Sequence, residues 1–265
     1  MKTSLLTSAL VAMTLVSGAG DMAKAPMAKA PIEECLDLGA EMTVGYETDY
    51  IFNGIRFARD SAWADVNYTF DGLLVPVTVG AWYLNGINGS INGPIMDELR
   101  LSASAAIGTF AGFDADLGYT HYTFPEFRSN FAPVGGYGEL GLALSRKLGV
   151  VDLNLRSSYA MGGGGLAPNG WYHELGLQKS FGITDGVSLV LGTGVAYTDG
   201  YWGGSGWNHY FANASLPISL NCRTTLTPYV GYVGAPDTWI VDGIRGADQN
   251  QSDILHGGVS LTVSF

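Results

Sequence analysis

The sequence predicts an all-β protein, a transmembrane antiparallel up-and-down β-barrel of about twelve strands. Three observations predict it: an export signal at the N-terminus, a low content of charge, and long segments whose apolar residues alternate with polar ones. Hydrophobic residues make up 47% of the chain and charged residues only 14%, below the roughly 25% that is usual in soluble proteins. An alternating chain with so little charge is typical of a barrel whose outer face contacts lipid.

The first 19 residues have the composition of a secretory signal peptide. Lys2 supplies a positive charge, Leu5–Val16 is apolar, and Ser17–Ala19 offers the small residues of a cleavage site. The apolar stretch is shorter than the about 20 residues that a helix needs to cross a bilayer. We therefore expect residues 1–19 to be removed on export to an oxidising compartment, and not to remain as an anchor.

Residues 20–39 form a lead-in to the barrel. The segment Met-Ala-Lys-Ala-Pro occurs there twice, at Met22–Pro26 and at Met27–Pro31. Its proline and alanine content predicts an extended periplasmic tether. The barrel itself is predicted to occupy residues 40–265.

From Ala40 onward the apolar residues recur with period two, the pattern of β-strands. Most segments with this pattern have about 10 residues or more, as membrane-spanning strands require, whereas strands of globular proteins have a mode nearer 5–6 residues. The predicted strands are Ala40–Phe52, Ala62–Phe70, Val75–Asn85, Asp97–Thr109, Gly112–Phe124, Tyr137–Lys147, Val150–Met161, Trp171–Phe181, Val187–Thr198, Trp207–Ile218, Cys222–Val233 and Ile254–Phe265.

The connections between these strands alternate in length, which is typical of outer-membrane barrels with short periplasmic turns and long extracellular loops. The tight connections are Asp71–Leu74, Phe110–Ala111, Leu148–Gly149, Gly182–Gly186 and Ser219–Asn221. The longer, polar ones are Asn53–Ser61, Gly86–Met96, Pro125–Gly136, Gly162–Gly170, Asp199–Gly206 and Gly234–Asp253.

Aromatic residues near the strand ends predict two girdles at the levels of the lipid headgroups. Phe70, Phe181 and Phe265 fall at periplasmic ends. The opposite girdle comprises Tyr50, Phe52, Tyr83, Tyr119, Tyr159, Trp171, Tyr197, Tyr210 and Tyr232. A terminal Phe265 on an alternating strand also resembles the assembly signal of outer-membrane barrels, so we expect the barrel-assembly machinery to be a partner during insertion and membrane lipid to surround the product.

Several short segments, in chain order, are similar to segments of one known family. Thr48–Ile55 is similar to an early Ser-Asp-Tyr-x-Phe-Arg-Gly segment of that family, with Asn53 in place of its usual Arg. The other matching segments are Val79–Asn85, Asp97–Leu99, Gly118–Pro125, Tyr137–Leu140 and Tyr172–Leu175. The chain thus resembles the TorF family of porins. The resemblance implies a porin-type barrel in the bacterial outer membrane, and it leaves open any rim charge that the replaced Arg would carry.

The polar faces of the predicted strands give the candidate lining of a pore. The candidates are Glu47, Asp49, Asp65, Glu98, Arg100, Asp114, Asp116, Glu139, Asp152, Arg156, Glu174 and Arg223. Carboxylates outnumber bases among them, and charge of one sign sets the preference of a pore. We therefore expect passive passage of small polar solutes or ions with a modest cation preference. Pairing of these groups into networks that fill a narrow barrel is the alternative.

A hydrolase and an adhesive barrel are the two alternatives to a pore. His121 and His173 lie near the extracellular rim on the apolar face, but neither belongs to a nucleophile motif. An outer-membrane hydrolase is therefore the minor alternative. The sequence predicts no enzyme, no catalytic residue, no metal and no cofactor. The loop Gly234–Asp253 carries Trp239 among other apolar residues, which suggests either a binding tip of an adhesive barrel or a plug. The net charge of -11 argues against nucleic-acid binding. The sequence does not define the oligomeric state.

The chain has two cysteines. Cys35 precedes the first predicted strand and Cys222 begins the eleventh, both at the periplasmic end. The last strand of a closed barrel lies between these two strands, which places their axes roughly 10 Å apart. We predict a Cys35–Cys222 disulfide that ties the lead-in to the barrel.

Overall fold

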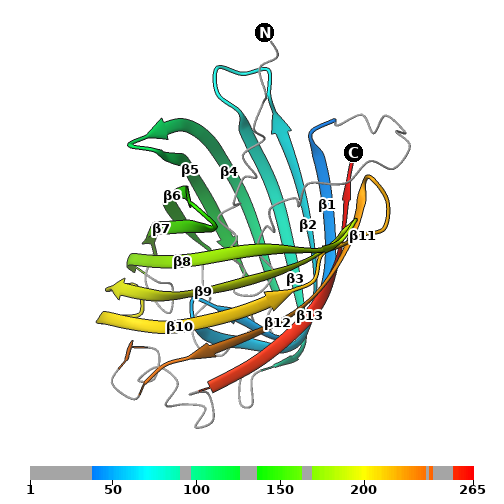
Figure 1. Cartoon of the computed structure of the whole chain (residues 1–265). Coiled ribbons are helices and arrows are strands. Elements are labelled where there is room, and N and C mark those ends of the chain that lie inside the picture. Colours follow the sequence, from blue (N-terminus) through cyan, green and yellow to red (C-terminus); the bar gives the residue numbers. More distant parts are fainter. Residues whose placement is uncertain (1–37, 90–96, 126–135, 163–168, 237–238, 241–252) are drawn as a thin grey trace.

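The computed structural model describes residues 38–89, 97–125, 136–162, 169–236, 239–240 and 253–265. Thirteen strands form one sheet that closes into a barrel (Figure 1). One of them, β11, has only two residues, so twelve strands build the wall. The strands are β1 (Ala40–Phe52), β2 (Ile55–Phe70), β3 (Val77–Gly89), β4 (Asp97–Phe110), β5 (Phe113–Thr123), β6 (Tyr137–Leu148), β7 (Val151–Met161), β8 (Asn169–Thr184), β9 (Val187–Asp199), β10 (Ser205–Ser215), β11 (Ile218–Ser219), β12 (Thr224–Gly234) and β13 (Asp253–Ser264).

Every wall strand pairs antiparallel with its neighbours in the chain, as the sequence predicted for an up-and-down barrel. The barrel closes where β1 pairs with β13, in a register that runs from Glu41 opposite Ser264 to Glu47 opposite Gly258. Phe265 continues this closure, since its backbone N–H donates to the carbonyl of Ala40 at 2.8 Å. Over this stretch closure pairs the first and the last strand, so neither is a free sheet edge there.

Two predicted elements were wrong. The segment Asn53–Ser61 was predicted as a loop, but β2 already begins at Ile55 and the connection is the two-residue turn Asn53–Gly54. Both turn residues have positive φ, 47° and 84°, the conformation that Asn-Gly hairpin turns supply. The predicted strand Trp207–Ile218 ends at Ser215, because Pro217 has no N–H to donate to the ladder.

The two ends of the barrel differ in their connections. The end with the short connections, here called the turn end, carries Ala111–Gly112, Gly149–Val150 and Asp185–Gly186. The other end, the loop end, carries the Asn53–Gly54 turn and the longer segments that include 90–96, 124–136 and 235–252. Among the described residues, no helix combines the length and the apolar character that a membrane crossing requires.

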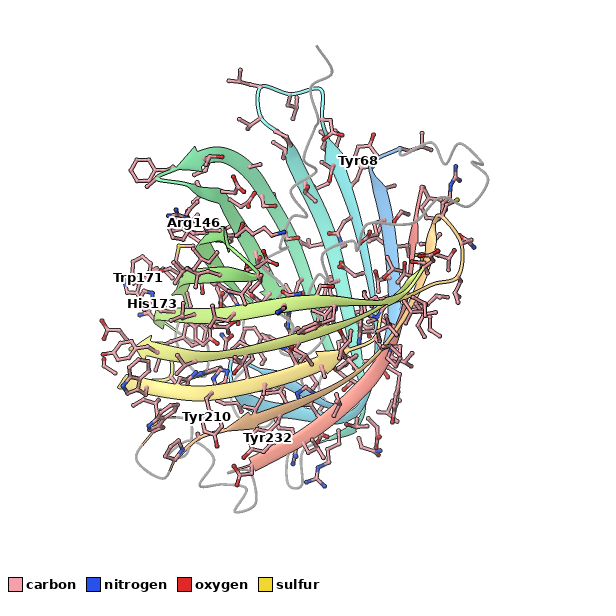
Figure 2. The ribbon with its side chains drawn as sticks, viewed as in Figure 1. Tyr68, Arg146, Trp171, His173, Tyr210 and Tyr232 are labelled. Carbon is pink, nitrogen blue, oxygen red and sulfur yellow. The ribbon has the colours of Figure 1, made fainter. Side chains whose placement is uncertain are left out.

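Apolar side chains cover the outer surface. Figure 2 shows Tyr68, Trp171, Tyr210 and Tyr232 directed away from the barrel interior. Leucine and valine residues from the middle of the strands, such as Leu117, are also exposed. The aromatic residues of the predicted girdles that are exposed in the structure are Phe70, Tyr83, Tyr119, Trp171, Phe181, Tyr197, Tyr210 and Phe265.

Tyr50 and Phe52 contradict the girdle prediction. Their side chains are 0% and 4% exposed and belong to an aromatic cluster inside the barrel. The alternation of faces places both residues on the outer face of β1, but Ile51 on the other face is 0% exposed as well, so both faces of this end of the strand are enclosed. The register of β1 with β2 shifts by one residue here, with Phe57 as the extra residue of β2, and a β-bulge of this kind bends the strand pair. The end of β1 therefore turns inward.

Candidate functional site in the barrel lumen

The tip of the β1–β2 hairpin lies inside the barrel. We call residues Tyr50–Phe57 the lumen hairpin. Beyond Glu47 the described residues of β1 no longer pair with β13, and β2 pairs with β3 only as far as Ala58. In the described part of the chain, the tip pairs with itself alone, through Ile51 opposite Arg56 and Phe52 opposite Ile55. Figure 1 draws it in blue behind β10 and β12.

The lumen hairpin contacts strands on several sides of the barrel. The hydroxyl of Tyr50 donates to Glu98 of β4 at 2.8 Å. The ring of Phe52 lies 5.6 Å from that of Tyr122 in β5. The side-chain amide of Asn208, in β10, donates to the backbone carbonyl of Asn53 at 3.0 Å. Because these partners come from β4, β5 and β10, the hairpin crosses the lumen.

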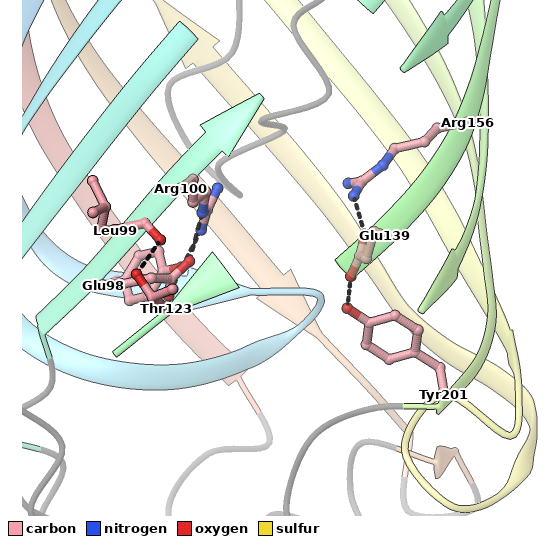
Figure 3. A network of polar contacts seen from close by, with 8 residues as sticks. Glu98, Leu99, Arg100, Thr123, Glu139, Arg156 and Tyr201 are labelled. Atoms are coloured by element: carbon pink, nitrogen blue, oxygen red, sulfur yellow. Dashed lines mark hydrogen bonds and ion pairs between the residues drawn. The ribbon is translucent and has the colours of Figure 1, made fainter. Parts of the chain in front are cut away.

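Arg100 is the centre of the wall that faces the hairpin. Its side chain is 1% exposed and its Nε lies 2.5 Å from Oε1 of Glu98, as Figure 3 shows. The guanidinium also donates to the hydroxyl of Tyr50 and lies 4.1 Å above the ring of Trp82 and 5.1 Å from that of Phe52. A buried guanidinium needs such compensation, since removing a charge from water costs several kcal/mol.

A second ion pair lies on the next strands of the wall. Nη2 of Arg156, in β7, lies 3.5 Å from Oε2 of Glu139 in β6. Glu139 also accepts a hydrogen bond from the hydroxyl of Tyr201, which follows β9 (Figure 3). Burial raises the pKa of Tyr201 well above its ordinary value, so the phenol keeps the proton that it donates. Nearby, Tyr172 donates to Glu174 at 2.7 Å.

Aromatic rings connect the two ion pairs. Tyr122 and Tyr137 stack with their ring centroids 4.5 Å apart and an interplanar angle of 5°, and Arg100 lies 5.3 Å from the Tyr122 ring. Phe57 and Trp202 pack against this cluster. The buried residues of the cluster, which we call the loop-half cluster, are Tyr50, Phe52, Ala58, Trp63, Trp82, Leu84, Tyr122, Tyr137, Ala160, Tyr172, Ala196 and Tyr201. Side chains therefore occupy the interior toward the loop end.

The interior toward the turn end has a different lining. Small hydroxyl side chains face one another there, with Thr43 bonded to Thr262 at 3.0 Å and Thr69 to Thr78 at 2.8 Å. Asp65 accepts a hydrogen bond from Asn67 at 2.8 Å within the same wall. Short hydroxyl and carboxylate side chains leave this half polar and without the aromatic rings of the other half.

The structure places the predicted lining residues in three groups. Toward the loop end and the middle, the interior holds Glu47, Asp49, Glu98, Arg100, Glu139, Arg156 and Glu174, which are buried or nearly so. Toward the turn end lie Asp65, Asp116 and Asp152, which are half-buried. Asp114 is exposed beside the β4–β5 turn, where it accepts a hydrogen bond from Thr109 at 2.7 Å.

Arg223 was wrongly assigned to the pore lining. It is exposed and belongs to the connection that precedes β12, which begins only at Thr224. The period-two count started two residues too early, at Cys222. In the connection the Arg223 backbone N–H donates to the Asn221 side chain at 2.8 Å, so a turn and not the strand ladder orients it.

Sequence reasoning also missed two arginines in the interior, Arg56 and Arg59. Nε of Arg56 lies 2.7 Å from Oδ1 of Asp49 across the hairpin, and Arg59 is opposite Asp49 in the register. Both fell within a segment predicted as a loop. The dipeptide Asn53–Gly54 was the signal that could have found them, because Asn-Gly between alternating residues is a strong hairpin indicator.

Two further predictions concern the N-terminal part of the chain. Cys222 takes part in a disulfide bond, whereas Cys35 lies outside the described residues, so the predicted Cys35–Cys222 pairing stays a prediction. The signal peptide predicted over residues 1–19 also lies outside them, as does nearly all of the lead-in predicted over 20–39. Among the described residues, no cluster of three or more His, Cys, Asp or Glu side chains is arranged to hold a metal ion.

A closed barrel of twelve antiparallel strands, with an apolar outer surface, a polar interior and short turns at one end, has the architecture of outer-membrane β-barrels. Solved structures of that class are similar to this one. The KdgM porin superposes with a TM-score of 0.53 at 10% identity, over 85% of this chain and 99% of the porin. An outer-membrane channel from Pseudomonas putida F1 gives 0.52 at 15% identity, over 90% of this chain and all of the channel.

The same architecture occurs outside channels. The translocator domain of the autotransporter NalP from Neisseria meningitidis superposes with a TM-score of 0.50 at 15% identity, over 88% of this chain and 90% of that domain. No family model matches the sequence and no curated protein matches it, so the likeness to the TorF family rests on the short motifs alone. At these identities the comparisons show the fold.

Proposed function

We propose that this protein is an outer-membrane channel for passive passage of small polar solutes or ions, with a modest preference for cations. The observation that carries the proposal is the contrast between the two faces of the wall. The outer face exposes apolar side chains such as Leu117 and Leu177, whereas the interior toward the turn end is lined by hydroxyls and carboxylates. Such a lining stabilises water and solutes inside a lipid-embedded barrel. The short connections of the turn end then face the periplasm.

The cation preference comes from the turn half of the interior. Toward the loop end the carboxylates of Asp49, Glu98 and Glu139 have arginine partners, so their fields largely cancel. Toward the turn end Asp65 and Asp116 are held by neutral neighbours or stand beside another carboxylate. Glu41 acts on Asp65 more strongly than Arg100 does, so this half keeps an excess of negative charge, which attracts cations.

Reconstitution of the purified protein in planar bilayers tests both parts of the proposal. We expect single-channel currents, and a reversal potential in a KCl gradient that shifts toward the potassium equilibrium potential. A shift toward the chloride equilibrium potential would contradict the cation preference. The absence of current from the wild type and from every variant described below would contradict the channel itself.

A hydrolase is the second candidate, and one contact favours it. Ser157 and Nδ1 of His173 lie 2.9 Å apart on the outer face of β7 and β8, in an apolar depression of about 270 Å³. A serine hydrolase also needs a group that orients the imidazole and N–H donors for an oxyanion. The His173 ring instead stacks on Trp171 at 5.8 Å and 8°, and the backbone of Ser157 belongs to paired strands. The contact gives the Ser157 hydroxyl and the His173 imidazole a hydrogen-bond partner on an apolar surface.

Turnover of phospholipid in mixed micelles decides between the two candidates. We expect no release of fatty acid above the level of Ser157→Ala. Release that is lost in Ser157→Ala and in His173→Ala, but kept in His121→Ala, would favour the hydrolase. His121 is a matched control because it also lies near the loop end on the outer face, opposite Leu101 and Gly138 in the register.

A binding role of the loop before β13 is the third candidate. Trp239 belongs to the described residues of that loop. The centroid of its ring lies 6.0 Å from that of Trp207 and 6.0 Å from that of Tyr210. Both partners are exposed on the outer surface, so Trp239 lies outside the lumen. The contact supports a rim position for this part of the loop, and it gives no support to a role of Trp239 as a plug.

A further inference from the structure

We infer that the lumen hairpin, Tyr50–Phe57, is the plug of the channel, and that it opens the lumen by moving as a unit away from β10 and the loop-half cluster. The inference rests on the proposed channel function and assigns its gate to a segment of the wall itself. Three features carry it: the pairing of the hairpin, the contacts that hold its tip across the lumen, and the lack of space around its turn.

The pairing isolates the hairpin from the rest of the sheet. Among the described residues, β1 pairs with β13 up to Glu47 and β2 pairs with β3 from Ala58 onward, and the tip between them has ladder partners only within itself. The register shift at this level, with Phe57 as the extra residue of β2, marks the position where the strand pair departs from the wall. Movement about this position breaks no hydrogen bond of the β1–β13 ladder. An element of this kind can have two discrete positions.

Hydrogen bonds of side chains and of one backbone carbonyl hold the tip in the lumen. Asn208 binds the carbonyl of Asn53, and Tyr50 binds Glu98 and Arg100. The salt bridge of Arg56 joins it to Asp49, in β1 of the same hairpin.

The tip fits closely against β10 and the cluster. A Cβ atom on Gly54 would lie 2.5 Å from Nδ1 of His209, so the turn approaches β10 as near as a glycine allows. The rings of Phe52 and Phe57 lie 6.4 Å and 6.2 Å from the ring of Trp202, which follows β9. The hairpin thus fills the width of the lumen between β4 and β10. Solute can pass only when it is displaced.

Two variants test the plug in opposite directions. Asn53→Cys with Asn208→Cys places a crosslink where the tip meets β10, and oxidation should lock the channel in its low-conductance state until reductant is added. Phe52→Ala with Phe57→Ala removes the rings that fill the lumen and should raise the mean conductance severalfold. Tyr68→Ala with Phe70→Ala is the matched control, because these two rings of β2 contact each other at 4.7 Å on the outer surface and their loss should leave the conductance unchanged.

The single-cysteine variants, treated with the same oxidant and reductant, control for effects on the native cysteines. Equal conductance of the wild type, the oxidised crosslinked protein and the Phe52→Ala, Phe57→Ala protein would overturn the plug and leave the channel function standing. Where the alanine variant fails to fold, the crosslinked protein decides alone, since it retains the aromatic rings of the cluster. No current from any of these proteins, folded variants included, would overturn the channel and the plug with it.

Discussion

The amide of Asn208 in β10 binds the backbone carbonyl of Asn53 in the β1–β2 turn, two residues 155 positions apart in the chain. The bond ties the tip of the first hairpin to the wall across the lumen. Asn53 occupies the left-handed region with a φ of 47°, where asparagine is tolerated better than most residues. The residue that departs from the TorF motif is thus suited to the turn that it forms.

The buried pair of Glu98 and Arg100 should be needed for stability. Glu98→Gln leaves the guanidinium of Arg100 without its counter-charge in the interior, which should lower the free energy of unfolding by about 3–5 kcal/mol. Adding Arg100→Met should restore most of the loss. Urea unfolding of the protein in lipid vesicles, followed by tryptophan fluorescence, measures the change. Asp71→Asn, an exposed change in the β2–β3 connection, should leave the free energy of unfolding unchanged. An equally large loss of stability in this variant would argue against a special role of the Glu98–Arg100 pair.

Gly45 allows an indole to lie against β1 inside the barrel. A Cβ at this position would lie 2.4 Å from the Trp63 ring, and that ring is buried and cannot easily shift. Gly45→Ala should therefore destabilise the barrel by about 1–3 kcal/mol through overpacking. Gly182→Ala is the matched control, since a Cβ there meets nothing within 4 Å. Equal midpoints of urea unfolding for the two variants would contradict the close packing.

The cost of placing a charged side chain on the outer surface should depend on its depth in the bilayer. Leu117 is exposed in the middle of β5, and Phe110 is exposed where β4 meets its turn. Leu117→Arg should cost about 2–4 kcal/mol if it faces the bilayer midplane, and Phe110→Arg about 0–1 kcal/mol at the interface. Unfolding titrations in vesicles give both values. A soluble barrel would show the same small cost for both.

The carboxylates toward the turn end should set the ion preference. Asp65→Asn combined with Asp116→Asn should reduce the cation-to-anion permeability ratio in a KCl gradient, because the double change removes two uncompensated charges from the lining. Asp199→Asn, at an exposed position at the end of β9, should leave the ratio unchanged. An unchanged ratio in the double variant would assign the preference to other groups.

Cys222 should resist thiol reagents in the purified protein as long as no reductant is present, because it is disulfide-bonded. Maleimide labelling followed by peptide mass mapping tests this and identifies the partner, which we predict to be Cys35. Modification of both cysteines in unreduced protein would disprove the bridge. A mixed disulfide with a second chain would disprove the predicted pairing.

The period of two was sufficient to predict the wall. In β7, for example, Asp152, Arg156 and Ser158 alternate with apolar residues and face the interior, as predicted. A regular strand fixes the face of every residue once one face is known. The barrel class, the strand order and most strand ends followed from this rule, and from the contrast between short and long connections.

The rule failed where the strand is irregular. Tyr50 and Phe52 were placed on the lipid face because a period of two separates the two faces of a strand and gives no sign that both faces are enclosed, as they are at Tyr50, Ile51 and Phe52. Arg56 and Arg59 were missed for a related reason, since polar residues next to an Asn-Gly turn resemble a loop in composition. The inward course of the hairpin depends on contacts with residues as distant as Asn208, which no local pattern reveals.

The closure of β13 on β1 has a consequence for biogenesis. Glu41 pairs with Ser264, so the last ladder of the barrel can form only after nearly the whole chain has been synthesised and exported. Contacts of such long sequence separation make folding slow, because loop closure must be completed before the pairing stabilises it. During that interval the apolar faces and unpaired strand edges are open to aggregation. We therefore propose that the chain needs a carrier in the periplasm that holds it unfolded until insertion.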